Sequence, residues 1–266
     1  MNEESAVRIC CVQAESFPNA PEKNLARAKA FAREAQEQGA SLIVFPEQFP
    51  TGWDPQGKEF TDDGSGSICR GWAAIARETG IHVMGSYRKE TATMPQNVAA
   101  VFAPEGVCIA EYAKIHLFSP AGEDQSFVPG VALGIFTIGG MRFGIAICYD
   151  LRFPELFCAY ARAGCAAVVV PAAWPCVRMS HWNLFLHARA LENQMYVAGI
   201  NPAEGHPEGE YCGGTTAINP QGEVVAKAEG TRTALVFADI DSALVRSTRA
   251  AFPVCADRRD DLYPSL

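Results

Sequence analysis

Short runs of apolar residues recur along the chain, and they constrain its fold more than any other feature of the sequence. The runs are rich in Val, Ile and Phe, and they lack the strict alternation of apolar and polar residues that marks a strand with one solvent face. We therefore expect strands that are buried on both faces, at residues 7–12, 42–45, 81–86, 143–147, 167–170 and 196–200.

Helix-like segments separate several of these strands. After Pro21, which favours a helix start, Leu25, Ala28, Ala32 and Ala35 follow the spacing of one helix face. Similar segments predict helices at residues 72–78, 154–163, 179–193 and 241–250. Buried strands that alternate with helices are typical of an α/β fold in which helices cover sheets.

Two further segments, residues 99–112 and 215–228, have the pattern of β-hairpins. Their turns, at residues 103–106 and 219–222, both place Pro second and Gly fourth, as type I turns favour. Each hairpin follows a strand–helix–strand stretch. We therefore expect the two halves of the chain to be built alike, with paired sheets inside and helices outside.

Composition limits the possible partners. The chain has 266 residues, of which 48% are hydrophobic, so it can bury a large core without a metal or a disulfide, and we expect no cofactor. No low-complexity linker interrupts it, and we expect a single domain over residues 1–266, with loops at residues 49–66 and 201–214. A net charge of −8 without a basic cluster argues against nucleic acid or an anionic membrane surface. No apolar run is long enough to span a bilayer.

The cysteines indicate a reducing compartment. There are 10 of them, and several lie in apolar strands, including Cys10, Cys11 and Cys108, which favours buried, reduced thiols over a disulfide framework. The first residues lack the pattern of a signal peptide, so we expect a cytoplasmic protein. The cysteines form no C-x-x-C pair and the 5 histidines have no ligand spacing, which argues against a metal site.

Cys148 differs from the other cysteines because it follows a buried strand and precedes a segment in which Pro154 can open a helix. A side chain at such a strand end is held rigidly at the edge of a cleft. The next backbone N–H, that of Tyr149, is then free to point at a developing oxyanion. These features suit a nucleophile. The alternative is a buried structural thiol, since most cysteines are unreactive.

Glu47 and Lys114 also follow strands and have apolar neighbours. Burial raises the pKa of a carboxyl group, which suits Glu47 as a general base that accepts a thiol proton. A cation at Lys114 would favour thiolate and stabilise an oxyanion. A glutamate in a structural ion pair and a surface lysine are the alternatives.

The motifs around these residues resemble those of the nitrilase superfamily. They are Phe-Pro-Glu47, Lys114-Ile-His-Leu-Phe and Cys148-Tyr-Asp-Leu-Arg-Phe-Pro-Glu. The resemblance continues through Gly122-Glu123, residues 127–130, His181-Trp182, residues 188–194 and residues 219–222. It implies a four-layer α-β-β-α sandwich that forms a homodimer or larger homo-oligomer.

The resemblance also implies roles for the site residues. Cys148 is the expected nucleophile, Glu47 the general base and Lys114 the stabiliser of the tetrahedral intermediate. Glu123 is a second carboxylate that orients the substrate or Lys114. The expected reaction releases ammonia or an amine on acylation and then hydrolyses a thioester.

Neighbouring residues most resemble the omega-amidase branch, which deamidates 2-oxoglutaramate and 2-oxosuccinamate. Trp174 follows a predicted strand and is a candidate pocket wall, and Arg178 is a candidate ligand for a substrate carboxylate. A surface or dimer contact is an equal alternative for Arg178. Near the nucleophile, the charges of Asp150, Arg152 and Glu155 predict a supporting ion-pair network.

Other functions remain open at this stage. Nitrilase, aliphatic amidase and carbamoyl-amine hydrolase share the same three catalytic residue types, and a Cys–His hydrolase could pair Cys148 with His116 or His181. A homologue without activity could bind a metabolite or a protein through the same pocket. The segment Tyr211-Cys212-Gly213-Gly214-Thr215-Thr216 departs from related sequences, which often carry His and Ser after the glycine.

Overall fold

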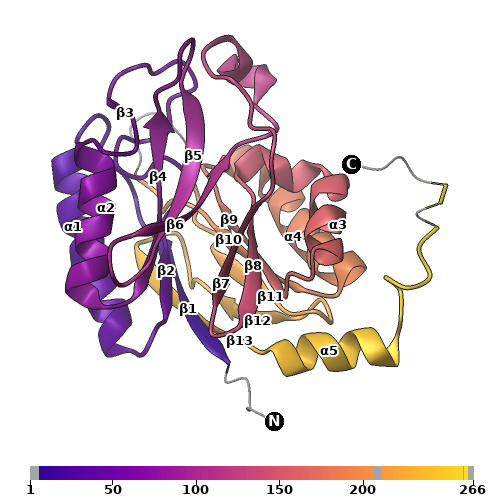
Figure 1. Cartoon of the computed structure of the whole chain (residues 1–266). Helices are drawn as coiled ribbons and strands as arrows, with labels where there is room; N and C mark the ends of the chain where they lie inside the picture. The colour runs from indigo at the N-terminus through magenta and orange to yellow at the C-terminus, as the bar shows by residue number, and fades with distance from the viewer. Residues whose placement is uncertain (1–5, 206–210, 260, 263–266) are drawn as a thin grey trace.

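The computed structural model describes residues 6–205, 211–259 and 261–262, and within them the strands form two sheets. Sheet A has the order β13-β1-β2-β4-β5-β6, and β3 pairs with β4. Helices α1 (Pro21–Glu37) and α2 (Ser67–Thr79) cover its outer face (Figure 1). Its strands are β1 (Val7–Gln13), β2 (Leu42–Val44), β3 (Thr61–Asp62), β4 (His82–Lys89), β5 (Gln96–Phe102), β6 (Cys108–Ala113) and β13 (Ala234–Ile240).

Sheet B has the order β12-β11-β10-β9-β8-β7. Helices α3 (Pro154–Arg162) and α4 (Met179–Asn193) lie on its outer side, and α5 (Ser242–Ala251) follows β13 (Figure 1). The strands of sheet B are β7 (Gly134–Ile138), β8 (Met141–Ile145), β9 (Ala167–Pro171), β10 (Tyr196–Ile200), β11 (Thr216–Ile218) and β12 (Val224–Lys227). The predicted four layers, helices outside and two sheets inside, are confirmed.

The two sheets have the same topology. In sheet A, β13 is antiparallel to β1, the strands β1, β2 and β4 are parallel, and β5 and β6 return antiparallel. In sheet B, β7 is antiparallel to β8, the strands β8, β9 and β10 are parallel, and β11 and β12 return antiparallel. Both predicted hairpins therefore exist, and the expectation that the two halves are built alike is confirmed.

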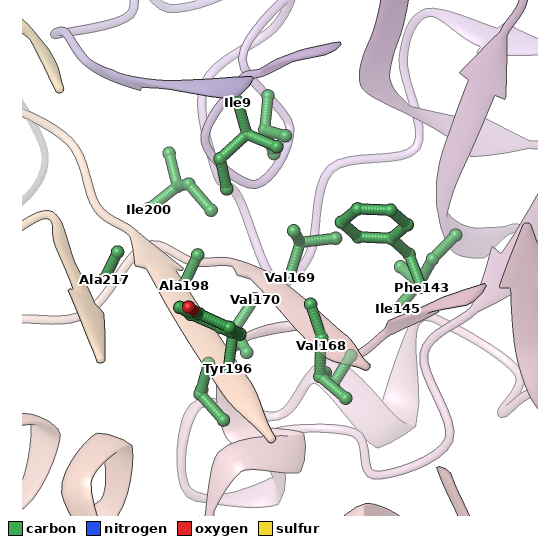
Figure 2. Packing of buried hydrophobic residues seen from close by; sticks show 14 of the residues in the cluster. Ile9, Phe143, Ile145, Val168, Val169, Val170, Tyr196, Ala198, Ile200 and Ala217 are labelled. Atoms are coloured by element: carbon green, nitrogen blue, oxygen red, sulfur yellow. The ribbon is translucent and has the colours of Figure 1, made fainter. Parts of the chain in front are cut away.

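Side-chain alternation along β1 divides the core. Ile9 and Cys11 belong to a cluster between the two sheets, whereas Cys10 and Val12 pack toward α1 and α2. Successive side chains of a strand point to opposite faces, so a strand covered on both sides must be apolar throughout. Figure 2 shows Ile9 facing side chains of sheet B, among them Val169 and Ile200.

The cysteine prediction is only partly confirmed. Cys10 and Cys11 are buried free thiols, but Cys108 is exposed because it lies on β6, an edge strand of sheet A. Cys176 and Cys212 form a disulfide across a separation of 36 residues, which the sequence spacing did not predict. Among the residues that the structure describes, the helices are too short or too polar to cross a bilayer.

Candidate active site

Strand ends deliver the candidate catalytic residues to one place. Glu47 lies shortly after β2, Lys114 directly follows β6, and Cys148 begins a short 3-10 helix, η3 (Cys148–Arg152), after β8. Glu123 begins another, η2 (Glu123–Gln125). All of these side chains are buried, so the ionisable groups interact with little screening by water.

Lys114 lies between the two carboxylates. Its Nζ donates to Glu47 Oε1 at 2.8 Å and to Glu123 Oε2 at 2.8 Å. Asn97 of β5 joins the same carboxylates, since its Nδ2 donates to Glu47 Oε1 at 2.7 Å and to Glu123 Oε1 at 3.0 Å. The structure thus brings together three of the predicted residues and adds Asn97.

Burial and the neighbouring charges determine the protonation states of Glu47 and Lys114. Burial raises the pKa of Glu47, the Lys114 ammonium opposes that shift, and Glu123 adds to it. Burial disfavours the charge on Lys114, but Glu47 and Glu123 outweigh burial and raise its pKa. Lys114 therefore stays an ammonium, and Glu47 is a more basic carboxylate than an exposed glutamate.

Glu47 has one oxygen available for proton transfer. Its Oε1 accepts hydrogen bonds from Lys114 and Asn97, whereas Oε2 is buried and has no hydrogen-bond partner within the described residues. Burial, together with the Glu47 charge, raises the pKa of the Cys148 thiol well above its ordinary value, and Lys114 only partly opposes this. The resting nucleophile is therefore a thiol that needs a base.

The backbone at the nucleophile is constrained. Cys148 has φ +47°, a left-handed conformation that non-glycine residues seldom adopt and that often marks functional sites. Asp150 holds this turn, because its carboxylate accepts from the backbone N–H groups of Ile147 (2.8 Å) and His116 (2.9 Å) and from the Tyr112 hydroxyl (2.8 Å). Tyr149 is the second residue of η3, where helical N–H groups have no intrahelical acceptor.

The predicted ion-pair network beside the nucleophile is wrong. Asp150 is fully buried and satisfied by the groups just described, together with Nδ1 of His116. Within the described chain, Arg152 makes no ion pair, and it instead lines a cavity next to Cys148. The Asp150 carboxylate accepts hydrogen bonds from Ile147 and His116, so it is not available as a partner for Arg152.

A cavity of about 130 Å³ opens onto Cys148. Both predicted substrate contacts, Trp174 and Arg178, belong to its wall, and the Trp174 indole N–H donates to the Arg178 carbonyl at 2.9 Å. The remaining lining residues are Trp53, Phe118, Tyr149, Arg152, Ala173, Pro175 and Tyr211. Neither His116 nor His181 is among the described lining residues, which removes the support for a Cys–His pair.

The disulfide joins two parts of this wall. Cys176 lies in η4 (Cys176–Arg178), which also carries Arg178, and Cys212 is adjacent to Tyr211. Pro175 and Tyr211 also form an isolated β-bridge. The segment that departs from related sequences is therefore tethered directly to the segment that bears Arg178.

Comparisons with known proteins identify the family. A family model for carbon-nitrogen hydrolases matches residues 8–250. The chain belongs to the carbon-nitrogen hydrolase family. This hydrolase is similar to omega-amidase NIT2 of Homo sapiens, with 37% identity over 254 residues that cover 90% of this chain and 91% of that protein.

Two further relatives agree with this assignment. The 2-oxoglutaramate amidase of Bacillus subtilis (strain 168) is 33% identical over 257 residues, which cover 96% of this hydrolase and 98% of that protein. The structure of a nitrilase-superfamily amidase from Nesterenkonia AN1 matches with a TM-score of 0.87 and 28% identity, and covers 97% of this chain and 96% of that chain. The predicted superfamily, fold and cysteine-dependent hydrolysis of carbon–nitrogen bonds are confirmed.

Several cavity and cluster residues of this hydrolase were missed by sequence reasoning. Asn97 lies near the start of β5, where the polar pair Gln96-Asn97 before an apolar run is the only signal. Trp53 and Phe118 lie in loops that follow Glu47 and Lys114, so their closeness to those residues was available from the sequence. Arg152 was noticed but assigned to the wrong partner.

Proposed function

We propose that this hydrolase is an omega-amidase, which converts the ω-amide of a small 2-oxo dicarboxylic acid to the 2-oxo acid and ammonia. The observation that carries the proposal is the Cys148 cavity with Arg178 in its wall, since a guanidinium suits a carboxylate at the far end of the substrate. The names of the relatives from Homo sapiens and Bacillus subtilis support the same substrate class.

Acylation begins at Cys148. Glu47 Oε2 accepts the thiol proton, and the sulfur attacks the amide carbon. The Lys114 ammonium and the Tyr149 N–H stabilise the oxyanion that forms. Glu47 then gives the proton to the amide nitrogen, so the carbon–nitrogen bond breaks, ammonia leaves and a thioester remains on Cys148.

Deacylation repeats these steps with water. Glu47 accepts a proton from water, the hydroxide attacks the thioester carbon, and the same groups stabilise the second oxyanion. The carbon–sulfur bond then breaks, Cys148 regains its proton from Glu47, and the 2-oxo acid leaves. In a solved structure of a mutant of the Nesterenkonia amidase, the acetamide moiety of fluoroacetamide is covalently attached to the active-site cysteine, so the cysteine of that relative acts as a nucleophile.

Glu123 has a positioning role in this scheme. It accepts from Lys114 Nζ at 2.8 Å and from the backbone N–H of Phe118 at 2.6 Å. These contacts hold the ammonium near Glu47 and join it to the Phe118 wall of the cavity. Trp174 forms the apolar wall that contacts the methylene groups of the substrate, and Arg178 binds its carboxylate.

The test is ammonia release from 2-oxoglutaramate, with glutamine, an aliphatic amide, an N-carbamoyl amine and a nitrile in parallel. Cys148→Ala is the blank. We expect turnover of the oxo-amide above the blank and above every other substrate. Preferred turnover of another substrate would keep the mechanism but reject the omega-amidase proposal.

We also propose that a single domain over residues 1–266 works as a cytoplasmic homodimer. Exposed apolar side chains on and near two helices support association, namely Leu184 and Leu191 of α4 and Phe252 after α5. Free thiols at eight cysteines support a reducing compartment, and the Cys176–Cys212 disulfide opposes it. Sedimentation equilibrium tests the dimer, and Leu191→Arg should shift the mass toward that of a monomer.

A further inference from the structure

Arg152 lines the catalytic cavity, and its guanidinium is surrounded by aromatic rings. Its Cζ lies 4.8 Å from the ring centroid of Trp174, 5.4 Å from that of Phe185 and 5.8 Å from that of Tyr149. Trp174 and Tyr149 line the same cavity as Cys148. Ring faces attract a guanidinium without occupying its N–H donors in hydrogen bonds, so they help to fix the position of Arg152.

No carboxylate of the described residues neutralises Arg152. Asp150, the nearest acid along the chain, accepts from Ile147, Tyr112 and His116 instead. The polar contact of the guanidinium is Nδ1 of His181, at 3.4 Å from Nη1 and 3.5 Å from Nη2. A partly buried cation beside a nucleophile and without a protein counter-ion is suited to an anionic ligand.

A second arginine lies at the same cavity. Arg178 also lines it, with its Cζ 5.7 Å from the Phe118 ring centroid, and the described lining includes no Asp or Glu. Burial lowers the pKa of Arg152; Tyr149 opposes this shift and the charge of Arg178 adds to it. The cavity therefore presents two neighbouring cations to whatever part of the substrate lies away from Cys148.

We infer that Arg152 acts with Arg178 as a two-arginine clamp that selects 2-oxo acid amides over the corresponding 2-amino acid amides. Arg178 binds the carboxylate, and Arg152 donates to the 2-oxo oxygen and to the nearer carboxylate oxygen. A 2-oxo group only accepts hydrogen bonds and carries no charge. The ammonium of a 2-amino acid would replace that acceptor with a third cation next to two guanidiniums, which repel it. This inference rests on the proposed function and adds a residue that discriminates against glutamine.

The kinetic test uses Arg152→Gln and Arg152→Lys, with Arg33→Gln of α1 as a matched change of charge on the outer layer over sheet A. The substrates are 2-oxoglutaramate, glutamine and butyramide, which lacks the carboxylate and the oxo group. We expect Arg152→Gln to lower kcat/KM for 2-oxoglutaramate by about 10- to 100-fold, the range for a hydrogen bond to a charged group. Butyramide turnover should change by less than about 3-fold, and the preference for the oxo-amide over glutamine should fall.

If Arg152→Gln lowered kcat/KM equally for all three substrates, Arg152 would have only a structural role. An unchanged preference for the oxo-amide over glutamine would overturn the clamp. A binding experiment keeps the inference separate from the proposed function. Cys148→Ala, with and without Arg152→Gln, is titrated calorimetrically with 2-oxoglutarate, which requires no turnover. If wild-type protein does not hydrolyse 2-oxoglutaramate, weaker binding in the double variant still supports the clamp, and equal binding rejects it.

Discussion

The backbone N–H of Glu47 donates to the carbonyl oxygen of Ala172 at 3.2 Å, and this hydrogen bond joins the two sheets at the active site. Glu47 follows β2 and Ala172 follows β9, each the middle one of three parallel strands in its sheet. The backbone of the next residue, Ala173, lies beside Cys148 and lowers the pKa of its thiol. The spacing of base and nucleophile is therefore set by how the two sheets pack.

The pH profile should report the environment of Glu47. The base must be ionised, and burial raises its pKa, so kcat/KM should fall with decreasing pH at a value above the ordinary glutamate pKa of about 4.3. On the alkaline side, the pKa values of Lys114 and Cys148 are also raised, so activity should persist through about pH 9. Rates of 2-oxoglutaramate hydrolysis across this range test both limbs, and a loss of activity between neutrality and that limit would contradict the assigned states.

Glu47→Gln gives the matched variant for this profile. Glutamine keeps an oxygen for the Lys114 and Asn97 hydrogen bonds but cannot take the thiol proton. We expect kcat to fall by about 10²- to 10⁴-fold, the usual contribution of a general base, with little change in thermal stability. An active variant with an unchanged acid limb would remove Glu47 from the proton path.

Much of the fold was predictable where burial was complete. The strand at residues 196–200 and the helix at residues 179–193 match β10 and α4 to the residue. The run at residues 196–200 is short and rich in β-branched and aromatic residues, which favours a strand over a buried helix. The strands β7 and β13 were missed. Both lie at sheet edges and alternate between buried and exposed residues, so their sequences contain no long apolar run.

The candidate site was predictable to the extent that it depends on strand ends. Glu47, Lys114 and Cys148 each follow a strand, and a family resemblance supported them. The link from Asn97 to Glu47 spans 50 residues, and Cys176 and Cys212 are separated by 36, so both depend on how strands from distant parts of the chain are placed. Local sequence patterns carry no information on such pairs.

Asn97 should position the general base. Its side-chain hydrogen bond lowers the pKa of Glu47, so Asn97→Ala should raise that pKa further and move the acid limb of kcat/KM to higher pH. Since a hydrogen bond to a charged group contributes about 1.5–3 kcal/mol, the shift should be large enough to resolve in the pH profile. Asn183→Ala, a change to the same residue type on the exposed side of α4, is the control. An acid limb that stays in place while activity falls would indicate a merely structural role.

The Cys176–Cys212 disulfide should stabilise the cavity wall. Titration of thiols in denaturant should detect eight before reduction and 10 after it. The double variant Cys176→Ser with Cys212→Ser should lose up to about 3–4 kcal/mol of unfolding free energy, as expected for a loop of this length. Its KM should also rise, because the cross-link tethers the segment that bears Arg178 to the Tyr211 segment.

Cys108→Ser is the control for the disulfide, since Cys108 is an exposed free thiol. It should leave both the unfolding free energy and KM unchanged. Detection of all thiols without reduction, or an unchanged KM in the double variant, would reject a role for this cross-link in the cavity.

Close packing of Trp72 on β4 should make Gly85 intolerant of any side chain. A Cβ at Gly85 would lie 2.1 Å from the Trp72 ring, whose indole N–H donates to the Ser86 carbonyl at 3.3 Å. The ring is fully buried between α2 and sheet A, so it has no room to move away. Gly85→Ala should therefore cost about 1–3 kcal/mol of unfolding free energy, as overpacked cores do.

A double-mutant cycle separates this clash from a general intolerance of β4 to substitution. Trp72→Phe replaces the indole with a smaller ring and opens space above Gly85, at its own cost in buried surface. In the combined variant the alanine methyl group should occupy that space, so the loss should be smaller than the sum of the single losses by more than about 0.5 kcal/mol. Urea unfolding of the four proteins measures the difference, and additive losses would show that Trp72 does not set the requirement for glycine.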